Sequence, residues 1–329
     1  MIISRTPYRI SFFGGGTDHP KWYSNNESIV LSTSINKYCY VNIRNLPPYF
    51  TFKYRLRYFT TELVSKINEI KHPVIRESLK SLKYNDKGIE MTHSGDLPAR
   101  SGVGSSSSFT VGFLNSLYSH MGYIPTKREL AIKAIDIEQN ILKENVGSQD
   151  QIAAAFGGFN KIKFHGNKIS VDPIKLNEDN MKKLQDSILF CYTGLSRDSD
   201  KVAKKQIDNI SRKFTDLTTM TNLSKHALQI LNSKKLDIKD FGELLKEQWL
   251  LKKSLNPTST NTEIERLYLK ALDLGAYGGK ISGAGAGGFL LLIAPKYKHN
   301  YIKKNLSKRL FVPIRFETTG SQIVFDSRN

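Results

Sequence analysis

The 329-residue chain has only two cysteines, Cys39 and Cys191, and they lie far apart. This usage fits neither a disulfide framework nor a zinc site, and it favours a reducing compartment. The chain also lacks any stretch of about 18 apolar residues, and its first residues lack a charged segment followed by an apolar run. We therefore expect a cytoplasmic protein without a membrane partner.

Acidic residues are scarce relative to basic ones. Lys and Arg total 49 against 30 for Asp and Glu, so the formal net charge is +19. A field of that sign attracts anions such as nucleic acid, acidic lipid or phosphorylated metabolites. The lysines are spread along the chain, which is typical of a solvated surface, and no basic stripe with interleaved aromatics is present. We therefore expect no nucleic-acid partner.

The length and composition indicate a folded protein with two domains. Hydrophobic residues make up 39% and charged residues 24% of the chain, which is ordinary globular usage. A chain of 329 residues exceeds the usual size of one hydrophobic core, so we expect domains at residues 1–180 and 181–329. Stretches rich in Ile, Val, Phe and Tyr predict short strands at residues 2–4, 10–13, 28–35 and 38–44. Because strands and helices mix in the second half, we expect an α+β fold.

A loop rich in glycine and serine leads directly into a predicted helix over residues 105–121. Apolar residues at spacings of three and four, from Phe109 to Met121, indicate that helix. Glycines let the backbone approach a phosphate, and the free N–H groups at a helix start favour an anion. The loop is not a Walker A motif, and a simple Gly/Ser linker is the alternative. The candidate phosphate-binding residues are Gly102, Val103, Gly104, Ser105, Ser106 and Ser107.

Three further glycine-containing segments are candidates for ligand contacts. The first, Phe13–Asp18, makes a tight turn after a strand, where an ordinary turn is equally consistent. The second, Asn145–Gln151, places Asp150 at a predicted helix start, where simple capping is the alternative. The third, Lys280–Gly288, puts small residues between two strands, so either another segment or a ligand packs closely against its backbone.

One carboxylate, Glu138, falls on the apolar face of a predicted helix. Thr126 and Glu129 form a capping-box pattern that predicts this helix over residues 126–143. On a helical wheel of period 3.6, Glu138 lies within about 60° of each apolar residue of the buried face. Those residues are Ala131, Ala134, Ile135, Ile141 and Leu142. Burying an unpaired carboxylate costs several kcal/mol, so Glu138 needs a donor network or a metal ion, or, as the alternative, an ion pair with a Lys or Arg.

Taken in order, these segments resemble the motifs of the GHMP kinases, the superfamily of galactokinase, homoserine kinase, mevalonate kinase and phosphomevalonate kinase. The three motifs are Pro7–Asp18, Pro98–Ser108 and Lys280–Gly288. The resemblance implies an N-terminal domain similar to domain 2 of ribosomal protein S5 and a ferredoxin-like C-terminal domain, with the active site between them. It also implies a kinase that uses ATP and Mg²⁺.

The resemblance assigns roles to single residues. Ser106 and Glu138 match the two Mg²⁺ ligands, which would explain a carboxylate on an apolar helix face. Asp150 matches the catalytic aspartate, which either takes the proton of the acceptor hydroxyl or only orients it. Arg9 matches a basic position beside it, where a cation would keep that carboxylate ionised. Asp18 matches the aspartate that holds sugar hydroxyls in galactokinase.

Further substrate contacts follow from the same resemblance. Gly15, Gly16 and Thr17 complete the turn of the first motif, and Gly283 belongs to the third. A phosphorylated acceptor needs a second anion site, for which Arg197 is the candidate because its segment is shared with the heptose kinases.

One departure from most relatives precedes the phosphate-binding loop. They have Pro-Pro-Gly or Pro-x-Gly there, whereas this chain reads Pro98-Ala99-Arg100. The change puts a cation beside the loop, where Arg100 either contacts a phosphate or points to water.

Within the superfamily, the chain is similar to the D-glycero-D-manno-heptose 7-phosphate kinases. Its Phe-Gly-Gly-Gly-Thr-Asp turn and its segment Tyr192–Ser199 both look like theirs. This similarity implies transfer of the γ-phosphate of ATP to the anomeric hydroxyl, which gives the 1,7-bisphosphate used in nucleotide-activated heptose biosynthesis. L-Fucose and galactose kinases are the main alternative, and a sugar sensor without catalysis is another. The expected partner is a small-molecule sugar phosphate, and a homodimer is compatible with the sequence.

Overall fold

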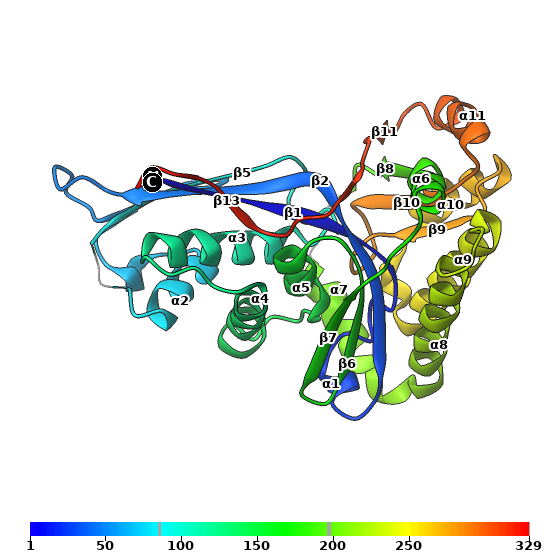
Figure 1. Cartoon of the computed structure of the whole chain (residues 1–329), viewed down its shortest axis with the longest axis horizontal. Coiled ribbons are helices and arrows are strands. Elements are labelled where there is room, and N and C mark those ends of the chain that lie inside the picture. The colour runs from blue at the N-terminus through cyan, green and yellow to red at the C-terminus, as the bar shows by residue number, and fades with distance from the viewer. Residues whose placement is uncertain (85–86, 196–198, 329) are drawn as a thin grey trace.

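Two β-sheets organise the chain, and helices pack around both (Figure 1). The computed structural model describes residues 1–84, 87–195 and 199–328, and in this part of the chain one sheet has nine strands and the other four. The helices and strands are segregated rather than alternating regularly, which confirms the expected α+β class. Among the described residues, no helix is long and apolar enough to cross a membrane.

The larger sheet contains most of the strands from the first half of the chain. Its strands are β1 (Ile2–Phe13), β2 (Ser28–Asn45), β3 (Tyr54–Arg57), β4 (Thr61–Val64), β5 (Ile89–Gly95), β6 (Phe159–His165), β7 (Lys168–Pro173), β12 (Phe316–Glu317) and β13 (Gln322–Asp326). The order is β13-β1-β2-β5-β3-β4, while β6 and β12 also pair with β2, and β7 pairs with β6.

Strands β1 and β2 form the centre of that sheet. They pair antiparallel from Ile2 opposite Ile43 to Phe13 opposite Leu31. The four short strands predicted here merge into two long ones because nearly every side chain of β1 and of the first half of β2 is buried, so no solvated turn interrupts them. The register shifts between Ser11 and Phe13, just before the glycine turn that follows β1. Such irregularities commonly bend a strand near a functional site.

Eleven α-helices and several shorter helical turns occur in the described part of the chain. The α-helices are α1 (Pro20–Tyr23), α2 (Pro73–Ser81), α3 (Ser105–His120), α4 (Lys127–Ile135), α5 (Gln149–Phe156), α6 (Glu178–Asp186), α7 (Ser199–Asn209), α8 (Phe214–Leu231), α9 (Ile238–Leu255), α10 (Thr262–Asp273) and α11 (His299–Asn305). The 3-10 turns are η1 (Ile67–Glu69), η3 (Ile210–Arg212), η4 (Pro257–Ser259) and η5 (Lys296–Lys298), and η2 (Asp136–Ile141) is a π-helix. Helices α2, α3, α4 and α5 cover one face of the larger sheet (Figure 1).

The smaller sheet has apolar layers on both faces. It contains β8 (Ile188–Tyr192), β9 (Gly278–Ile281), β10 (Phe289–Ile293) and β11 (Leu310–Phe311), in the order β11-β8-β10-β9. Along β10, Phe289 and Leu291 join the main core with α8 and α9, whereas Leu290 and Leu292 join a second cluster with α10 and α11. The main core also contains Phe12 of β1 and Phe241 of α9, whose rings meet edge to face at 5.6 Å. The two sheets therefore share one continuous core.

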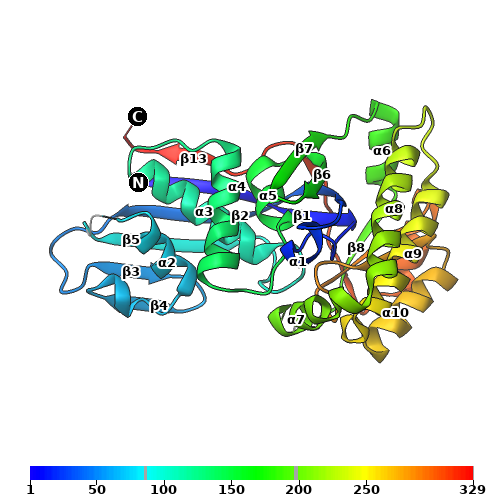
Figure 2. The same ribbon diagram turned by 90° about the horizontal axis from the view of Figure 1, so that it is seen from below.

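The end of the chain returns to the larger sheet. Strand β13 pairs antiparallel with β1, and β12 pairs with β2. The two termini accordingly lie side by side at one end of the molecule (Figure 2). The domain boundary between residues 180 and 181 stays a proposal. Strands β12 and β13 follow that boundary in the sequence but belong to the larger sheet.

The predicted helix over residues 126–143 is not uniform. Its capping box is confirmed, because the Thr126 side chain accepts from the Glu129 backbone N–H and Glu129 accepts from that of Thr126. However, α4 ends at Ile135 and continues as the π-helix η2. The wider turn shifts the helical register, so Ile141 is 38% exposed and does not share the predicted buried face. Glu138 is nevertheless fully buried.

Candidate active site

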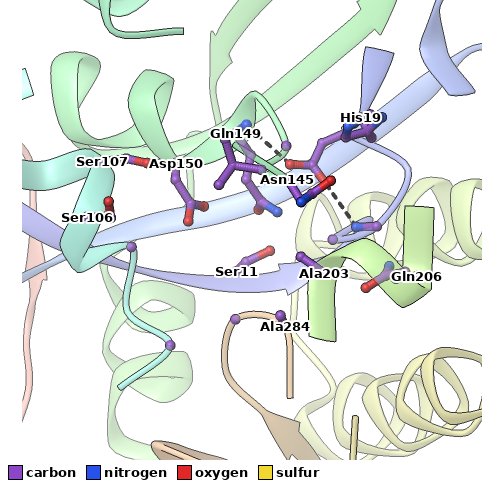
Figure 3. A pocket seen from close by; sticks show the side chains of 18 of the residues that line it. Ser11, His19, Ser106, Ser107, Asn145, Gln149, Asp150, Ala203, Gln206 and Ala284 are labelled. Carbon is purple, nitrogen blue, oxygen red and sulfur yellow. Dashed lines mark hydrogen bonds between the residues drawn. The ribbon is translucent and has the colours of Figure 1, made fainter. Parts of the chain in front are cut away.

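A cavity of about 410 Å³ is the candidate active site. It collects residues from the turn after β1, the loop before α3, the start of α5, helix α7 and the loop between β9 and β10 (Figure 3). Of the residues predicted from the sequence, those lining it are Arg9, Gly15, Gly16, Asp18, Gly102, Gly104, Ser105, Ser106, Ser107, Asp150 and Gly283. Residues expected to bind phosphate, to catalyse and to hold sugar therefore meet at one place.

The start of helix α3 faces this cavity. Its N-cap is Gly104, with a φ of 72° and no side-chain cap. The first intrahelical bond runs from the Ser108 N–H to the Gly104 carbonyl, at 2.9 Å. Ser105, Ser106 and Ser107 precede that bond and all line the cavity. A helix start without a side-chain cap is suited to an anion, because its N–H groups and the helix dipole both favour negative charge.

Close backbone packing explains the small residues of the Lys280–Gly288 segment. A Cβ on Gly102 would lie 2.4 Å from the Ser282 carbonyl oxygen, and a Cβ on Gly283 would lie 2.6 Å from the Gly102 Cα. The Ser282 hydroxyl also donates to the Gly102 carbonyl at 2.7 Å. The first of the two alternatives is therefore present: another chain segment packs against the backbone of Lys280–Gly288. That segment is the loop of residues 102–107, which this contact supports.

Arg9 and Asp150 form a two-bond ion pair at the cavity wall. Arg9 Nε donates to Asp150 Oδ1 at 2.8 Å, and Nη2 donates to Oδ2 at 2.6 Å. Arg9 Nη1 donates to the Gly102 carbonyl at 2.7 Å, so one guanidinium connects the carboxylate to the loop. Capping does not account for Asp150, because the N-cap of α5 is Ser148 and the Asp150 side chain bonds to Arg9. Two parallel bonds fix the carboxylate's orientation.

Asp18 is a second carboxylate in the cavity, and only 3% of its surface is exposed. It accepts from the backbone N–H of Gly16 at 2.8 Å and from that of Gln149 at 3.3 Å. Burial raises the pKa of Asp18, and these two backbone donors partly oppose that effect. The turn of the first motif thus holds Asp18 against the start of α5.

Glu138 is buried beneath the start of α3 rather than in the cavity wall. It accepts from Ser107 Oγ at 2.8 Å, from Thr110 Oγ1 at 2.6 Å and from Gln151 Nε2. Among the described residues no Lys or Arg pairs with it, so the alternative of a buried ion pair is wrong. Burial raises its pKa to about 7, although the three donors oppose the shift. Carboxylate and hydroxyl oxygens are the ligands that Mg²⁺ prefers, so this group and the nearby serines fit a divalent cation.

Two sequence-predicted residues, Val103 and Thr17, are buried away from the cavity. Val103 is fully buried, and its carbonyl accepts from the Arg9 N–H at 3.1 Å. Thr17 is also fully buried behind the turn, where its hydroxyl donates to the Gly14 carbonyl at 2.8 Å. Neither residue lines the cavity. Arg197 lies outside the described residues, whereas Arg100 lines the cavity with a left-handed φ of 59°.

Family models identify the chain's relatives. A model of the GHMP kinases N-terminal domain matches residues 68–158, and a model of the GHMP kinases C-terminal domain matches residues 228–310. Together the two matches cover more than half of the chain. The chain belongs to the GHMP kinases.

Two relatives define the class of this GHMP kinase. It is 28% identical over 318 residues to the D-glycero-alpha-D-manno-heptose 7-phosphate kinase of Campylobacter jejuni, and the match covers 92% of each chain. It is 25% identical over 335 residues to the galactokinase of Pyrococcus furiosus, and that match covers 90% of each. The protein is therefore an ATP-dependent sugar kinase.

Solved structures confirm the GHMP kinase fold. A D-glycero-D-manno-heptose 1-phosphate kinase from Bacteroides thetaiotaomicron matches with a TM-score of 0.76 and 22% identity over 99% of both chains. Galactokinase of Lactococcus lactis, solved with galactose, matches with a TM-score of 0.74 and 19% identity over 98% of this chain and 94% of that one.

Several cavity residues of this GHMP kinase were not identified as site residues from the sequence. They include Ser11, Gln149, Gln206, Lys252 and Lys280. Ser11, Gln149 and Lys280 lie inside segments already singled out, so their position was an available signal. Gln206 comes from the amphipathic helix α7, and no local pattern indicates that this helix reaches the cavity.

Lys280 is a buried cation that should make stability depend on pH. Burial lowers its pKa to about 7, Arg9 lowers it further and Asp18 opposes the shift. Between about pH 7 and pH 10 the unfolded chain keeps a proton that the folded protein releases, so this group favours folding more as the pH rises. We expect the melting temperature of wild type, minus that of Lys280→Met, to increase from pH 6.5 to pH 9 in thermal unfolding. A difference that stays constant with pH would contradict this assignment.

Proposed function

We propose that the protein transfers the γ-phosphate of ATP to the anomeric hydroxyl of D-glycero-D-manno-heptose 7-phosphate. The observation that carries the proposal is the meeting of three groups in one cavity: the start of α3, the Arg9–Asp150 pair and the buried Asp18. The choice of sugar is supported by the 28% identity to the Campylobacter jejuni heptose 7-phosphate kinase over 92% of the chain.

The nucleotide's phosphates would lie on the loop of residues 102–107. Their negative charge suits the N–H groups at the start of α3, and the left-handed backbone at Gly102 and Gly104 lets the loop approach them closely. Arg100 lies at the same side of the cavity and would add a positive charge. Phosphoryl transfer depends mainly on such positioning and charge neutralisation.

Ser106 and Glu138 would hold the Mg²⁺ of the nucleotide. Ser106 is exposed in the cavity wall, and the next residue, Ser107, donates to Glu138. A bound Mg²⁺ supplies charge neutralisation at the phosphate oxygens. A divalent cation would also give the buried Glu138 carboxylate the positive partner that no described side chain provides.

Asp18 would position the sugar, and Asp150 would accept the proton of its anomeric hydroxyl. Asp18 binds sugar hydroxyls in the turn with Gly15 and Gly16, while Asp150 faces the anomeric hydroxyl. As the hydroxyl oxygen bonds to the γ-phosphorus, the bond from that phosphorus to the β-phosphate bridging oxygen breaks and ADP leaves. The hydroxyl proton moves to the Asp150 carboxylate, which Arg9 holds in place.

The sugar's own phosphate needs a second anion site. Arg197 remains our candidate for it, although it lies outside the described residues. L-Fucose or galactose is the second candidate substrate, because the chain is also 25% identical to a galactokinase over 90% of its length.

A coupled assay of ADP release tests the substrate assignment. We expect kcat/KM for heptose 7-phosphate to exceed that for L-fucose, galactose and mevalonate by at least about 10²-fold, because buried polar groups reject acceptors that leave them unpaired. Mg-ATP without an acceptor is the background control. A higher kcat/KM for fucose or galactose would replace the heptose assignment with the alternative.

A further inference from the structure

Three polar side chains on the cavity wall have no role in the mechanism above. Ser11 comes from β1, Gln149 from the start of α5 and Lys280 from β9, and all three line the cavity. Their exposed fractions are only 4%, 8% and 2%. Polar groups so deeply buried normally have hydrogen-bond partners within the protein.

Two of these side chains lack such partners. Within the described part of the chain, Ser11 Oγ and Gln149 Oε1 are buried without any hydrogen bond. The Lys280 ammonium donates to the Ser11 carbonyl at 2.8 Å and to the Phe12 carbonyl at 3.0 Å. An ammonium group has three N–H donors, so while Lys280 is protonated one further donor remains for the cavity.

The Ser11 hydroxyl and the Gln149 side-chain amide both reach one small volume beside Gly15. A methyl group built on Gly15 would meet Gln149 Nε2 at 3.3 Å and Ser11 Oγ at 3.4 Å. Figure 3 shows Gln149 pointing from α5 toward Ser11 on β1, next to Asp150. The Lys280 ammonium is held at the same point of β1, because it bonds to the Ser11 carbonyl.

The mixture of free donors and acceptors selects the chemistry of the ligand. A sugar hydroxyl can donate to Gln149 Oε1 and accept from Lys280 or Ser11 at the same time, whereas a phosphate oxygen at neutral pH mainly accepts. We infer that Ser11, Gln149 and Lys280 form a subsite for a hydroxyl group of the sugar, in addition to the contact with Asp18. This inference rests on the proposed function only because the proposed function places the sugar in this cavity.

Ser11→Ala is the sharpest test, because the buried Ser11 hydroxyl makes no hydrogen bond within the described part of the chain that the change would remove. We expect the KM for heptose 7-phosphate to rise about 3- to 10-fold, the effect of one hydrogen bond, while the KM for ATP and the melting temperature stay unchanged. Gln149→Met, which removes both the donor and the acceptor, should raise the sugar KM further.

Ser32→Ala is the matched control. Ser32 lies opposite Ser11 in the β1–β2 pair, is 1% exposed and also has a buried hydroxyl without a partner, but it does not line the cavity. Its replacement should leave both KM values within two-fold of wild type. Sugar KM values within two-fold of wild type in both Ser11→Ala and Gln149→Met would overturn the subsite.

The test is independent of which sugar proves best. If wild type prefers fucose or galactose, the substrate assignment fails, and the KM values are measured with that sugar instead. The subsite fails only if the two replacements do not change the KM of the preferred acceptor.

Discussion

Replacing Asp150 by asparagine should lower kcat by roughly 10²–10⁴-fold, the usual effect of losing a positioned base. Asparagine has nearly the same shape but cannot accept the proton of the sugar hydroxyl. The KM values for ATP and sugar should change much less, because other residues make most of the binding contacts. Steady-state ADP release, with both substrates varied, measures these constants.

The same replacement should also lower the melting temperature. The Arg9 side chain is only 4% exposed, and its ion pair with Asp150 would be lost, which leaves a buried guanidinium without a charged partner. Asp172→Asn is a suitable control, because it breaks an ion pair with Lys161 on the surface, where Asp172 is 54% exposed. A kcat near that of wild type in a folded Asp150→Asn protein would remove Asp150 from the catalytic role.

Replacing Glu138 by glutamine should reduce kcat by about 10²-fold or more, because a metal ligand contributes several kcal/mol of charge stabilisation in the transition state. Glutamine keeps a carbonyl that can accept from Thr110 or Ser107, so the local packing should survive. The concentration of Mg²⁺ needed for half-maximal activity should rise as well. A titration of activity with Mg²⁺ at saturating ATP measures both effects.

Stability should move in the opposite direction from activity in this variant. Burial raises the pKa of Glu138 to about 7, so at pH 8 this carboxylate is mostly ionised in the metal-free protein. Among the described residues, no cation pairs with it. Glutamine removes that charge, and the melting temperature of the metal-free variant should equal or exceed that of wild type at pH 8. Unchanged kcat and unchanged Mg²⁺ dependence would show that Glu138 is only a structural residue.

The motifs of the sequence were sufficient to locate the cavity. The loop of residues 102–107 leads into α3 as the helical spacing from Phe109 to Met121 predicts. Glu138 is buried as the helical wheel predicts, although the π-helix η2 alters the register of its neighbours. A fixed period of 3.6 cannot anticipate one wider turn, and so Ile141 was placed on the wrong face.

Features that depend on contacts between distant segments could not be predicted. The pairing of β13 with β1 joins the two ends of the chain, and no local pattern encodes it. Ser11 lies within the first motif, but its position in a predicted strand does not indicate which way its side chain points. Its place in the cavity becomes visible only when Gln149 from α5 and Lys280 from β9 are brought beside it.

The most direct test of the account is ³¹P NMR of the reaction products of wild type with Mg-ATP and heptose 7-phosphate. The account predicts a second sugar phosphate signal, coupled to the anomeric proton, that grows as the γ-phosphate signal of ATP disappears and ADP forms. Asp150→Asn should produce that signal at least about 10²-fold more slowly. A new phosphate on any carbon other than the anomeric one, or no product while galactose or fucose is phosphorylated, would contradict the account.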